Sequence, residues 1–558
     1  MTLSGSLSHT PVAIVGGGPV GLMLAMFLDF HGVACTVFNA ASTIRPHPKG
    51  STQNARTMEH YRQLGFAHRV RELGLPMEHP TDVAYFTRFS GWELARLPMP
   101  SETEKRNAVR NSDALDQVPE PIHRANQMYV EQILLEEAAA RPHITLKFGM
   151  RIDSIYQDDE GVTLTAVDTA HGETISWRAS YAVGCDGGRS FVRKHLGIAY
   201  EGFENLQQAF FGGRMISTYL RAPTLYRDFL GTRRAWQYWI VNPQIRTALV
   251  ALNGKDEFLL WTRDEHPNAP VDARHIAAAL QACAGTDLPV EIIAHGKWTA
   301  GVALVAEKFA RRRIFLAGDS AHLFTPTGGF GMNTGVDDAA NLAWKLSGSI
   351  QGWAGSGLLA SYEIERKPIA HRNTTAAREL ARSVGMVPVP PELEEDSAAG
   401  AKARTDTGAF LSTFGEEYAS LGVQLGARYD GSPIVVADGP APADNPIHYI
   451  ASSVPGGRTP HFWIDNGRGK GSSLFDRLGR GFTLLCFRPP SRDVAQLEKA
   501  AQERGIPLTA LPIAHEEARA FYGVDRILIR PDQHIAWRGN AIPEDAKGLL
   551  GKVTGAAS

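Results

Sequence analysis

The stretch Pro11-Val-Ala-Ile-Val-Gly-Gly-Gly-Pro-Val-Gly21 decides how the first part of the chain folds. Its apolar first half predicts a buried strand, and the residues after the glycines predict a helix over 20–30. A second apolar strand is expected over 34–38. Strand, turn, helix and strand form the opening of a βαβ unit, and the glycines have the GxGxxG spacing of a dinucleotide phosphate site.

Each glycine of this turn has its own expected role. Gly16 permits the tight turn, Gly18 lets the backbone approach a pyrophosphate, and Gly21 lets the helix pack closely. The helix start presents N–H groups and a positive dipole end to the phosphate. We therefore predict that the cofactor-binding residues of this turn are Gly16, Gly18, Pro19, Val20 and Gly21.

The end of the second strand departs from the usual pattern. A carboxylate commonly stands about 20 residues after the glycines and receives the ribose hydroxyls, but this chain has Asn39. The amide oxygen of Asn39 can still accept a hydroxyl proton, although without charge assistance. We expect Asn39 to bind a ribose, and to bind it more weakly.

Two segments far downstream belong with the glycine turn. Residues 182–193 run from an apolar strand end through Asp186 into a basic helix start. Residues 314–322 end a second apolar strand at Gly-Asp, with the carboxylate on Asp319, and the glycine-rich residues 326–335 follow.

In these segments the chain closely resembles the class A flavoprotein aromatic hydroxylases, the group that includes para-hydroxybenzoate hydroxylase and phenol hydroxylase. The likeness covers residues 10–370 and keeps the family's motif order. It implies FAD as the cofactor, with backbone N–H groups of the glycine-rich turn facing the flavin N1 and C2 carbonyl, where reduced flavin gathers negative charge. The further FAD contacts that the resemblance implies are Arg56, Gln127, Asp186, Asp319, Gly329, Gly331, Met332 and Asn333.

The resemblance also implies an activity. NADH or NADPH would bind transiently, since the chain has one dinucleotide fingerprint, and would reduce FAD. O2 would then be captured as a flavin C4a-hydroperoxide, and its distal oxygen delivered to a phenolic or related aromatic substrate. Because the cofactor carries this chemistry, no catalytic triad, metal site or covalent nucleophile is expected, and no catalytic residue is named.

The expected architecture is α/β, with three units. A Rossmann-like FAD-binding domain of the glutathione-reductase type is predicted over 1–80, 120–200 and 300–385. Short runs bounded by Asn, Pro and Gly predict an inserted antiparallel-sheet substrate domain over 81–119 and 201–299. Residues 386–446 read as a linker or helical connection. Residues 447–558 resemble the thioredoxin-like carboxy-terminal domain of phenol hydroxylase and the 2,4-dichlorophenol hydroxylase group, without a CxxC motif.

The inserted sheet supplies candidate pocket residues. Strand alternation predicts Trp236 and Tyr238 on one face and Trp239 on the other. The predicted pocket residues are Tyr219, Trp236, Tyr238, Trp239 and Pro326. The roles of Arg45, His47 and Lys49, in the loop after the second strand, stay open.

Composition excludes several other classes. With 558 residues and a net charge of −2, the chain has no overall attraction to nucleic acid or to anionic membranes. The longest apolar run near the start, residues 20–28, is far below the ~20 residues that span a bilayer. The four cysteines are isolated, which favours free thiols in the cytoplasm. Monomer and homodimer both stay open.

Three rival functions use the same residues differently. A Baeyer–Villiger oxygenase on this scaffold would act on a polycyclic or aromatic ketone, and ketone turnover without phenol turnover would favour it. A flavin-dependent halogenase is disfavoured, because residues 236–243 lack its Trp-x-Trp-x-Ile-Pro pattern. A non-catalytic flavin-bearing interaction protein would show no substrate-stimulated NAD(P)H oxidation.

Overall fold

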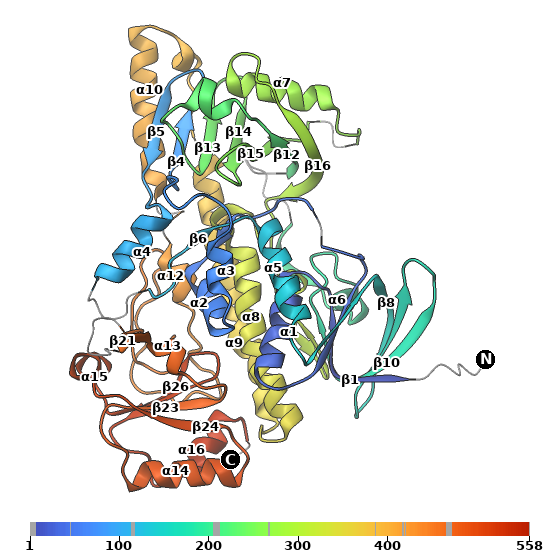
Figure 1. The fold of residues 1–558 in the computed structure, drawn as a ribbon, viewed down its shortest axis with the longest axis vertical. Coiled ribbons are helices and arrows are strands. Elements are labelled where there is room, and N and C mark those ends of the chain that lie inside the picture. Colours follow the sequence, from blue (N-terminus) through green and yellow to red (C-terminus); the bar gives the residue numbers. More distant parts are fainter. Residues whose placement is uncertain are drawn as a thin grey trace.

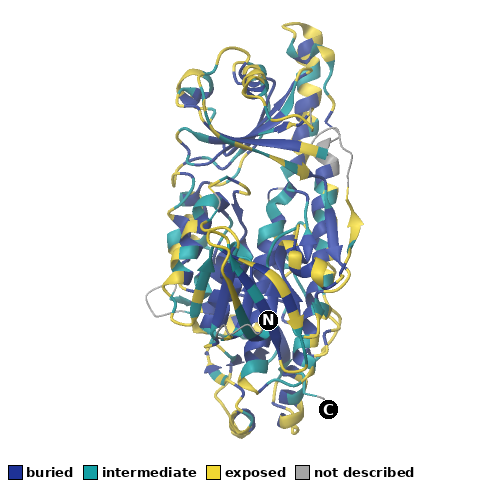
Figure 2. Ribbon diagram, turned by 90° about the vertical axis from the view of Figure 1, so that its right-hand side faces the viewer, coloured by how far each residue is buried: buried dark blue, intermediate teal, exposed yellow. Residues whose placement is uncertain are grey.

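The computed structural model describes residues 7–44, 46–112, 118–204, 213–265, 268–385, 387–415, 418, 420–464 and 471–556. Three sheets and the helices around them make up most of this part of the chain (Figure 1). Buried residues follow the strands of each sheet and the helices that lie against them (Figure 2).

The first sheet is built around β1 (Ser8–Val15), which is parallel to both β2 (Cys35–Asn39) and β10 (Thr174–Gly184). β7 (Ile144–Phe148) extends it beyond β2, and β19 (Ile314–Leu316) extends it beyond β10. The antiparallel strands at its margins are β8 (Met150–Gln157), β9 (Val162–Asp168) and β18 (Ala310–Arg311). The predicted βαβ opening is confirmed.

Three helices pack together beside this sheet. α1 (Pro19–Phe30) lies between α5 (Gln127–Ala139) and α8 (Phe330–Gln351), and its residues Leu22–Leu28 are buried. α9 (Gly357–Gly385) packs against α8 and carries Pro368 within it. The sequence predicts the start of α8 at residue 336, but the helix begins at Phe330, inside the glycine-rich stretch.

Short elements complete this region. The small strands are β3 (Thr52–Gln53), β6 (His123–Arg124), β11 (Tyr200–Phe203), β17 (Ala303–Ala306) and β20 (His322–Leu323). The small helices are α2 (Ala55–Gln63), α3 (Ala67–Arg71), α4 (Glu102–Asn111) and α6 (Phe191–His195). β3 pairs with β6, which places residue 52 beside residue 124.

The second sheet lies at one end of the molecule in Figure 1 and has the order β16-β12-β15-β14-β13-β4-β5. Its strands are β4 (Val83–Phe86), β5 (Glu93–Leu97), β12 (Gly213–Arg221), β13 (Gln237–Val241), β14 (Arg246–Ala251), β15 (Glu257–Arg263) and β16 (Glu291–Ala300). The expected antiparallel pairing holds except between β13 and β4, which run parallel.

Helical segments border the second sheet. They are a π-helical turn at Leu225–Leu230, α7 (Ala273–Ala284) and α10 (Ala398–Leu411). The short helix α12 (Leu421–Leu425) packs instead against α2 (Figure 1). α10 lies along β5, so closely that a Cβ on Gly408 would stand 2.2 Å from the Leu94 carbonyl oxygen. The segment expected as a linker is therefore packed on the sheet over α10.

The carboxy-terminal unit has a four-stranded sheet of order β24-β23-β25-β26. β23 (Phe482–Cys486) is parallel to β24 (Leu508–Pro512) and antiparallel to β25 (Arg526–Ile529), which pairs with β26 (Ile535–Gly539). The other elements are β21 (Trp463–Ile464), β22 (Ser472–Ser473), α13 (Leu474–Arg477), α14 (Arg492–Glu503), α15 (Glu516–Tyr522) and α16 (Ala546–Val553).

Buried ion pairs join this unit to the helices of the first region. Arg530 pairs with Glu365 of α9 at 2.7 Å, and Arg458 pairs with Glu59 of α2 at 2.6 Å. Buried charges left without partners are costly, so these pairs fix the carboxy-terminal unit in one position. Within the described residues, no helix is both long and apolar enough to span a membrane.

Candidate functional site

The glycine turn between β1 and α1 has the geometry that its sequence predicts. Gly16 has φ +115°, and a Cβ there would stand 2.3 Å from the Cys185 carbonyl oxygen. A Cβ on Gly21 would stand 1.9 Å from the Gly16 carbonyl oxygen. At Gly18, by contrast, a Cβ would meet no described atom within 4 Å. The open space therefore lies at the start of α1, where N–H groups are available to an anion.

Val20, at the start of α1, packs closely against Gly318 and against Gly335 of α8. A Cβ on Gly318 would stand 2.8 Å from a methyl group of Val20, and one on Gly335 would stand 2.6 Å away. Both positions therefore need glycine for α1 to lie against α8. This contact places Asp319 close to the start of α1, which Pro19 begins.

Asn39 ties the end of β2 to the glycine turn. Its amide oxygen accepts a hydrogen bond from the Gly17 N–H at 3.2 Å, and its amide nitrogen donates to the Ala41 carbonyl at 2.9 Å. An amide oxygen can accept a second hydrogen bond, so ribose binding by Asn39 stays a prediction.

The carboxylate of Asp186 caps a helix. It accepts hydrogen bonds from the Ser190 hydroxyl at 2.5 Å and from the N–H groups of Phe191 and Val192 at 2.6 and 3.1 Å. Burial raises the pKa of Asp186, against these hydrogen bonds, which lower it. The structure thus gives this carboxylate a capping role at α6, and its contact with the cofactor stays a prediction.

Asp319 lines a cavity beside the glycine-rich turn. Its backbone carbonyl accepts from the Tyr200 hydroxyl at 2.6 Å, and the residue is exposed to solvent where it lines the cavity. Desolvation by the surrounding protein raises the pKa of Asp319, while Lys49 and His322 act to lower it. The carboxylate is therefore presented to any ligand that enters the cavity.

A buried network of charged side chains holds the backbone next to Asp319. The Asp338 carboxylate accepts from His322 at 2.6 Å, from Arg366 at 2.8 Å and from the Gly318 N–H at 3.1 Å. Burial alone would raise the pKa of Asp338, but His322 and Arg366 hold it below its ordinary value. The network binds one backbone N–H of the Gly318-Asp319 segment directly and so fixes its course.

The glycine-rich turn is held in place by one asparagine. Gly328 and Gly329 have φ of +75° and +66°, conformations that favour glycine. The amide nitrogen of Asn333 donates to the carbonyls of Gly329 and Thr52 at 2.6 and 3.0 Å, and its oxygen accepts from the Asn54 N–H. Asn333 is thus a positioning residue for the turn.

The other predicted residues of this turn have different positions. Gly329 lines the cavity, whereas Gly331 and Met332 lie in the first turn of α8, half-buried and outside the cavity lining. The N–H groups of this first turn have no intrahelical partners, so they remain available to a ligand in front of the helix.

Two residues expected to touch FAD have protein partners. The Arg56 guanidinium donates to Glu59, to Gln533 and to the Asp532 carbonyl, at 2.7–2.9 Å, and so faces the carboxy-terminal unit. Gln127 donates to Glu131, its neighbour one turn along α5, at 2.6 Å. Both side chains are thus engaged with protein partners, and the FAD contacts predicted for Arg56 and Gln127 stay predictions.

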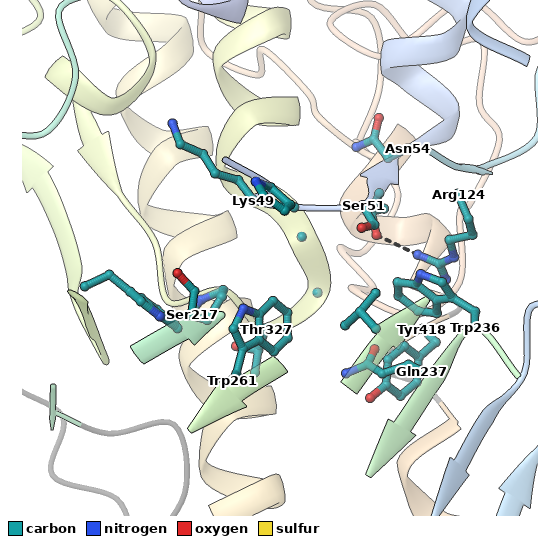
Figure 3. Close-up of a pocket in the computed structure, with 18 of the residues that line it drawn as sticks. Lys49, Ser51, Asn54, Arg124, Ser217, Trp236, Gln237, Trp261, Thr327 and Tyr418 are labelled. Atoms are coloured by element: carbon teal, nitrogen blue, oxygen red, sulfur yellow. Dashed lines mark hydrogen bonds between the residues drawn. The ribbon is translucent and has the colours of Figure 1, made fainter. Parts of the chain in front are cut away.

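A cavity of about 540 Å³ lies between the second sheet and the glycine-rich turn (Figure 3). Lys49, Ser217 and Trp261 stand on one side in the figure, and Arg124, Trp236, Gln237 and Tyr418 on the other. Further lining residues are His47, Pro48, Gly50, Ser51, Thr52, Asn54, Ile122, Trp239, Val250, Gly296, Lys297, Trp298, Asp319, Pro326, Thr327, Gly328, Gly329, Ser420 and Gln424.

Among the predicted pocket residues, Trp236, Trp239 and Pro326 line this cavity, but Tyr219 and Tyr238 do not. The Tyr219 hydroxyl donates to Glu257 at 2.9 Å, and the Tyr238 hydroxyl accepts from the Ala235 N–H at 2.6 Å. The predicted alternation fails because Trp236 precedes β13, which begins at Gln237. Gln237 and Trp239 then share the cavity face.

The loop after β2 contributes a polar group to the mouth of the cavity. His47 hydrogen-bonds Ser217 at 2.8 Å, and burial, with Lys49 and His295 nearby, lowers the pKa of His47. Arg45 lies outside the described residues. Sequence reasoning missed Arg124, Gln237, Trp261, Trp298 and Tyr418, since they come from five separate segments that meet only in the fold.

Family comparison identifies the class of protein. The FAD binding domain family matches residues 9–377, and the family of aromatic-ring hydroxylase carboxy-terminal domains matches residues 452–557. The chain belongs to the FAD-dependent aromatic-ring hydroxylases, so the predicted resemblance is confirmed and the protein is an FAD-dependent monooxygenase.

Individual relatives cover nearly the whole chain. A putative polyketide hydroxylase from Streptomyces halstedii is 30% identical, over 96% of this chain and 94% of its own. Phenol 2-monooxygenase from a Pseudomonas species is 28% identical, over 97% and 92%. The structure of chromopyrrolic acid-soaked RebC with bound 7-carboxy-K252c superposes with a TM-score of 0.88 at 33% identity, over 99% and 100%. The mixed α/β fold is thus that of solved flavin-dependent enzymes.

Proposed function

We propose that this monooxygenase hydroxylates a fused-ring phenolic compound, with NADH or NADPH and O2 as co-substrates. The observation that supports this proposal most strongly is the cavity of about 540 Å³ beside the glycine-rich turn. Its lining includes the four tryptophans Trp236, Trp239, Trp261 and Trp298. Flat aromatic walls suit a flat aromatic ligand, and the volume lies within the usual range for small-molecule sites. A polyketide hydroxylase among the relatives supports a substrate larger than phenol.

The domain division expected from the sequence is part of this proposal. FAD would be held by 1–80, 120–200 and 300–385, and substrate by 81–119 and 201–299, with 386–446 as a linker or helical connection. For 447–558, one parallel and two antiparallel strand pairs with helices nearby support a thioredoxin-like unit. It has the single cysteine Cys486, so dithiol exchange is excluded.

The described residues fit FAD. The space in front of Gly18 would take the pyrophosphate against the N–H groups of α1, and Asp319 would accept from the ribityl hydroxyls. The turn at Gly328-Gly329 and the first N–H groups of α8 would face the flavin ring. When bound, FAD supplies the redox and oxygen chemistry.

The protein's own contribution is placement and shielding. The tryptophan walls remove water from the substrate ring, which strengthens the electrostatic interactions inside the cavity. Asn333 holds the glycine-rich turn to β3, so the turn does not reorganise when charge develops in front of it. His47 and Ser217 offer polar contacts at the mouth.

The cytoplasm is the proposed compartment, supported by four cysteines that are all free. A homodimer stays a prediction, to be checked by sizing the purified protein in solution.

The experiment measures NADH and NADPH oxidation by the purified yellow protein with phenol, 2-naphthol and a hydroxyanthraquinone, quantifying hydroxylated product and hydrogen peroxide. We expect the fused-ring phenols to stimulate oxidation more than phenol, with product matching the NAD(P)H consumed. Oxygenation of ketones, without hydroxylation of any phenol, would contradict the proposal.

A further inference from the structure

One wall of the cavity contains a deeply buried cation. Arg124, on β6, is 5% exposed and lines the cavity. Its guanidinium carbon lies 3.8 Å from the centre of the Trp236 ring, and Nη1 donates to the Thr52 hydroxyl at 2.6 Å. Figure 3 shows the guanidinium stacked along Trp236, above Gln237 and Tyr418. The arginine plane is therefore fixed before any ligand binds.

This guanidinium differs from other buried arginines, which bind either carboxylates or backbone carbonyl oxygens. Arg193 and Arg526 bind carbonyl oxygens. Arg71, Arg366 and Arg530 each bind two carboxylates. Over the described residues, the Arg124 guanidinium makes one hydrogen bond, to the Thr52 hydroxyl, and no carboxylate forms an ion pair with it. Burial lowers the pKa of Arg124 to about 10, with Tyr418 acting in the opposite direction, so the side chain is still charged at neutral pH.

A buried cation without a counterion is costly, and this one borders the space for the aromatic substrate. We propose that Arg124 binds an anionic oxygen of that substrate, a carboxylate or a phenolate, and so selects acidic aromatic compounds. The inference rests on the proposed function, whose substrate class it narrows.

Geometry favours this assignment. A guanidinium presents N–H groups in a planar fork that matches a carboxylate or a pair of oxygens. Trp236 covers one face of the Arg124 guanidinium, so a planar substrate in the cavity can contact the edge of that guanidinium. Thr52 in turn lies against Gly329, where a Cβ would stand 2.9 Å from the Thr52 Cβ. The anionic end of the substrate would thus lie next to the glycine-rich turn.

The test measures binding to the FAD-loaded protein without turnover, by the change in flavin absorbance or tryptophan fluorescence. The probes are 2-naphthoate, 2-naphthol below and above its own pKa, and neutral 2-naphthamide. The variants are Arg124→Met, Arg124→Lys and the matched control Arg526→Met, which removes a buried arginine outside the cavity lining.

We expect Arg124→Met to weaken an anionic probe about 10- to 100-fold, the loss of a charge-assisted hydrogen bond, and 2-naphthamide less than about threefold. A loss confined to 2-naphthoate assigns a carboxylate, and a loss confined to ionised 2-naphthol assigns a phenolate. Arg526→Met should change each affinity less than about threefold, because Arg526 lies in the carboxy-terminal unit, away from the cavity.

Equal affinities of wild type and Arg124→Met for both anionic probes would overturn the inference. Loss of FAD from Arg124→Met with unchanged probe affinity would overturn it as well, and assign the arginine to the cofactor. If Arg124→Met fails to fold, Arg124→Lys decides: it should weaken the anionic probe more than threefold, since lysine lacks the fork.

The two proposals fail separately. The proposed function would stand and the role of Arg124 would fall if wild-type protein hydroxylates neutral fused-ring phenols yet binds no anionic probe better than 2-naphthamide. The role of Arg124 would stand and the proposed function would fall if the protein binds 2-naphthoate through Arg124 but forms no hydroxylated product.

Discussion

Replacing Gly18 and Gly21 by alanine separates the cofactor role of the glycine turn from its packing role. Gly18 has φ −81° and ψ −176°, a conformation open to alanine, and a Cβ there meets no described atom within 4 Å. Gly21 has no such room, since its Cβ would stand 1.9 Å from the Gly16 carbonyl oxygen. The same added methyl group therefore meets a ligand space at one position and backbone at the other.

We expect Gly18→Ala to leave the apoprotein as stable as wild type, or more stable by about 0.4–1 kcal/mol, because alanine restricts the unfolded chain. Its methyl group would push the pyrophosphate away from one backbone N–H, at a cost of about 1.5–3 kcal/mol for a hydrogen bond to a charged group. FAD affinity should then fall about 10- to 100-fold. Gly21→Ala should lower the apoprotein's melting temperature or prevent folding.

The assay combines thermal unfolding of apoprotein with FAD titration followed by quenching of flavin fluorescence. Wild-type FAD affinity in Gly18→Ala would refute the assignment of the open space to the pyrophosphate. A strongly destabilised Gly18→Ala apoprotein would refute the geometric argument itself.

Three further predictions concern charged groups. Asp319→Asn should weaken FAD binding and stabilise the apoprotein at neutral pH, because desolvation raises the pKa of the Asp319 carboxyl. In urea unfolding measured over a pH series, the gain in unfolding free energy should shrink as pH falls through that raised pKa. A gain in unfolding free energy that does not depend on pH would contradict the argument. Arg366→Met should cost about 3–5 kcal/mol in unfolding free energy, because it leaves Asp337 and Asp338 without their buried cation, whereas Arg366→Lys should cost less; equal losses would contradict this account. Arg458→Met should move acid unfolding to higher pH, because Arg458 and Arg56, against the effect of burial, lower the pKa of Glu59, and that stability is lost as pH falls. In a double-mutant cycle with Glu59→Gln the two changes should be non-additive, and additive losses would exclude coupling between the two side chains.

The sequence was sufficient for local features of the fold and insufficient for side-chain direction. Glycine spacing and strand period predicted β1, α1 and β2, because both signals are set by neighbouring residues. The parallel pairing of β13 with β4 joins segments about 150 residues apart, which no local pattern encodes.

The site shows the same division. The turn role of Gly16 and the packing role of Gly21 agree with the structure, because local glycine spacing encodes both. The pyrophosphate contact of Gly18 stays a prediction. The protein partners of Arg56 could not be predicted, because its motif says nothing of the buried surface of the carboxy-terminal unit that it meets. Arg124 was missed for the converse reason, since its importance depends on the absence of a carboxylate partner, which only the described fold reveals.

The most direct test of the central claim is isotope incorporation under 18O2. The FAD-loaded protein is supplied with NAD(P)H and a fused-ring phenol, and the mass of the product is measured by mass spectrometry. Our account predicts one atom of 18O in a new ring hydroxyl and the second in water. Unlabelled product, or label found in an ester formed from a ketone with no ring hydroxylation, would contradict aromatic hydroxylation by this protein.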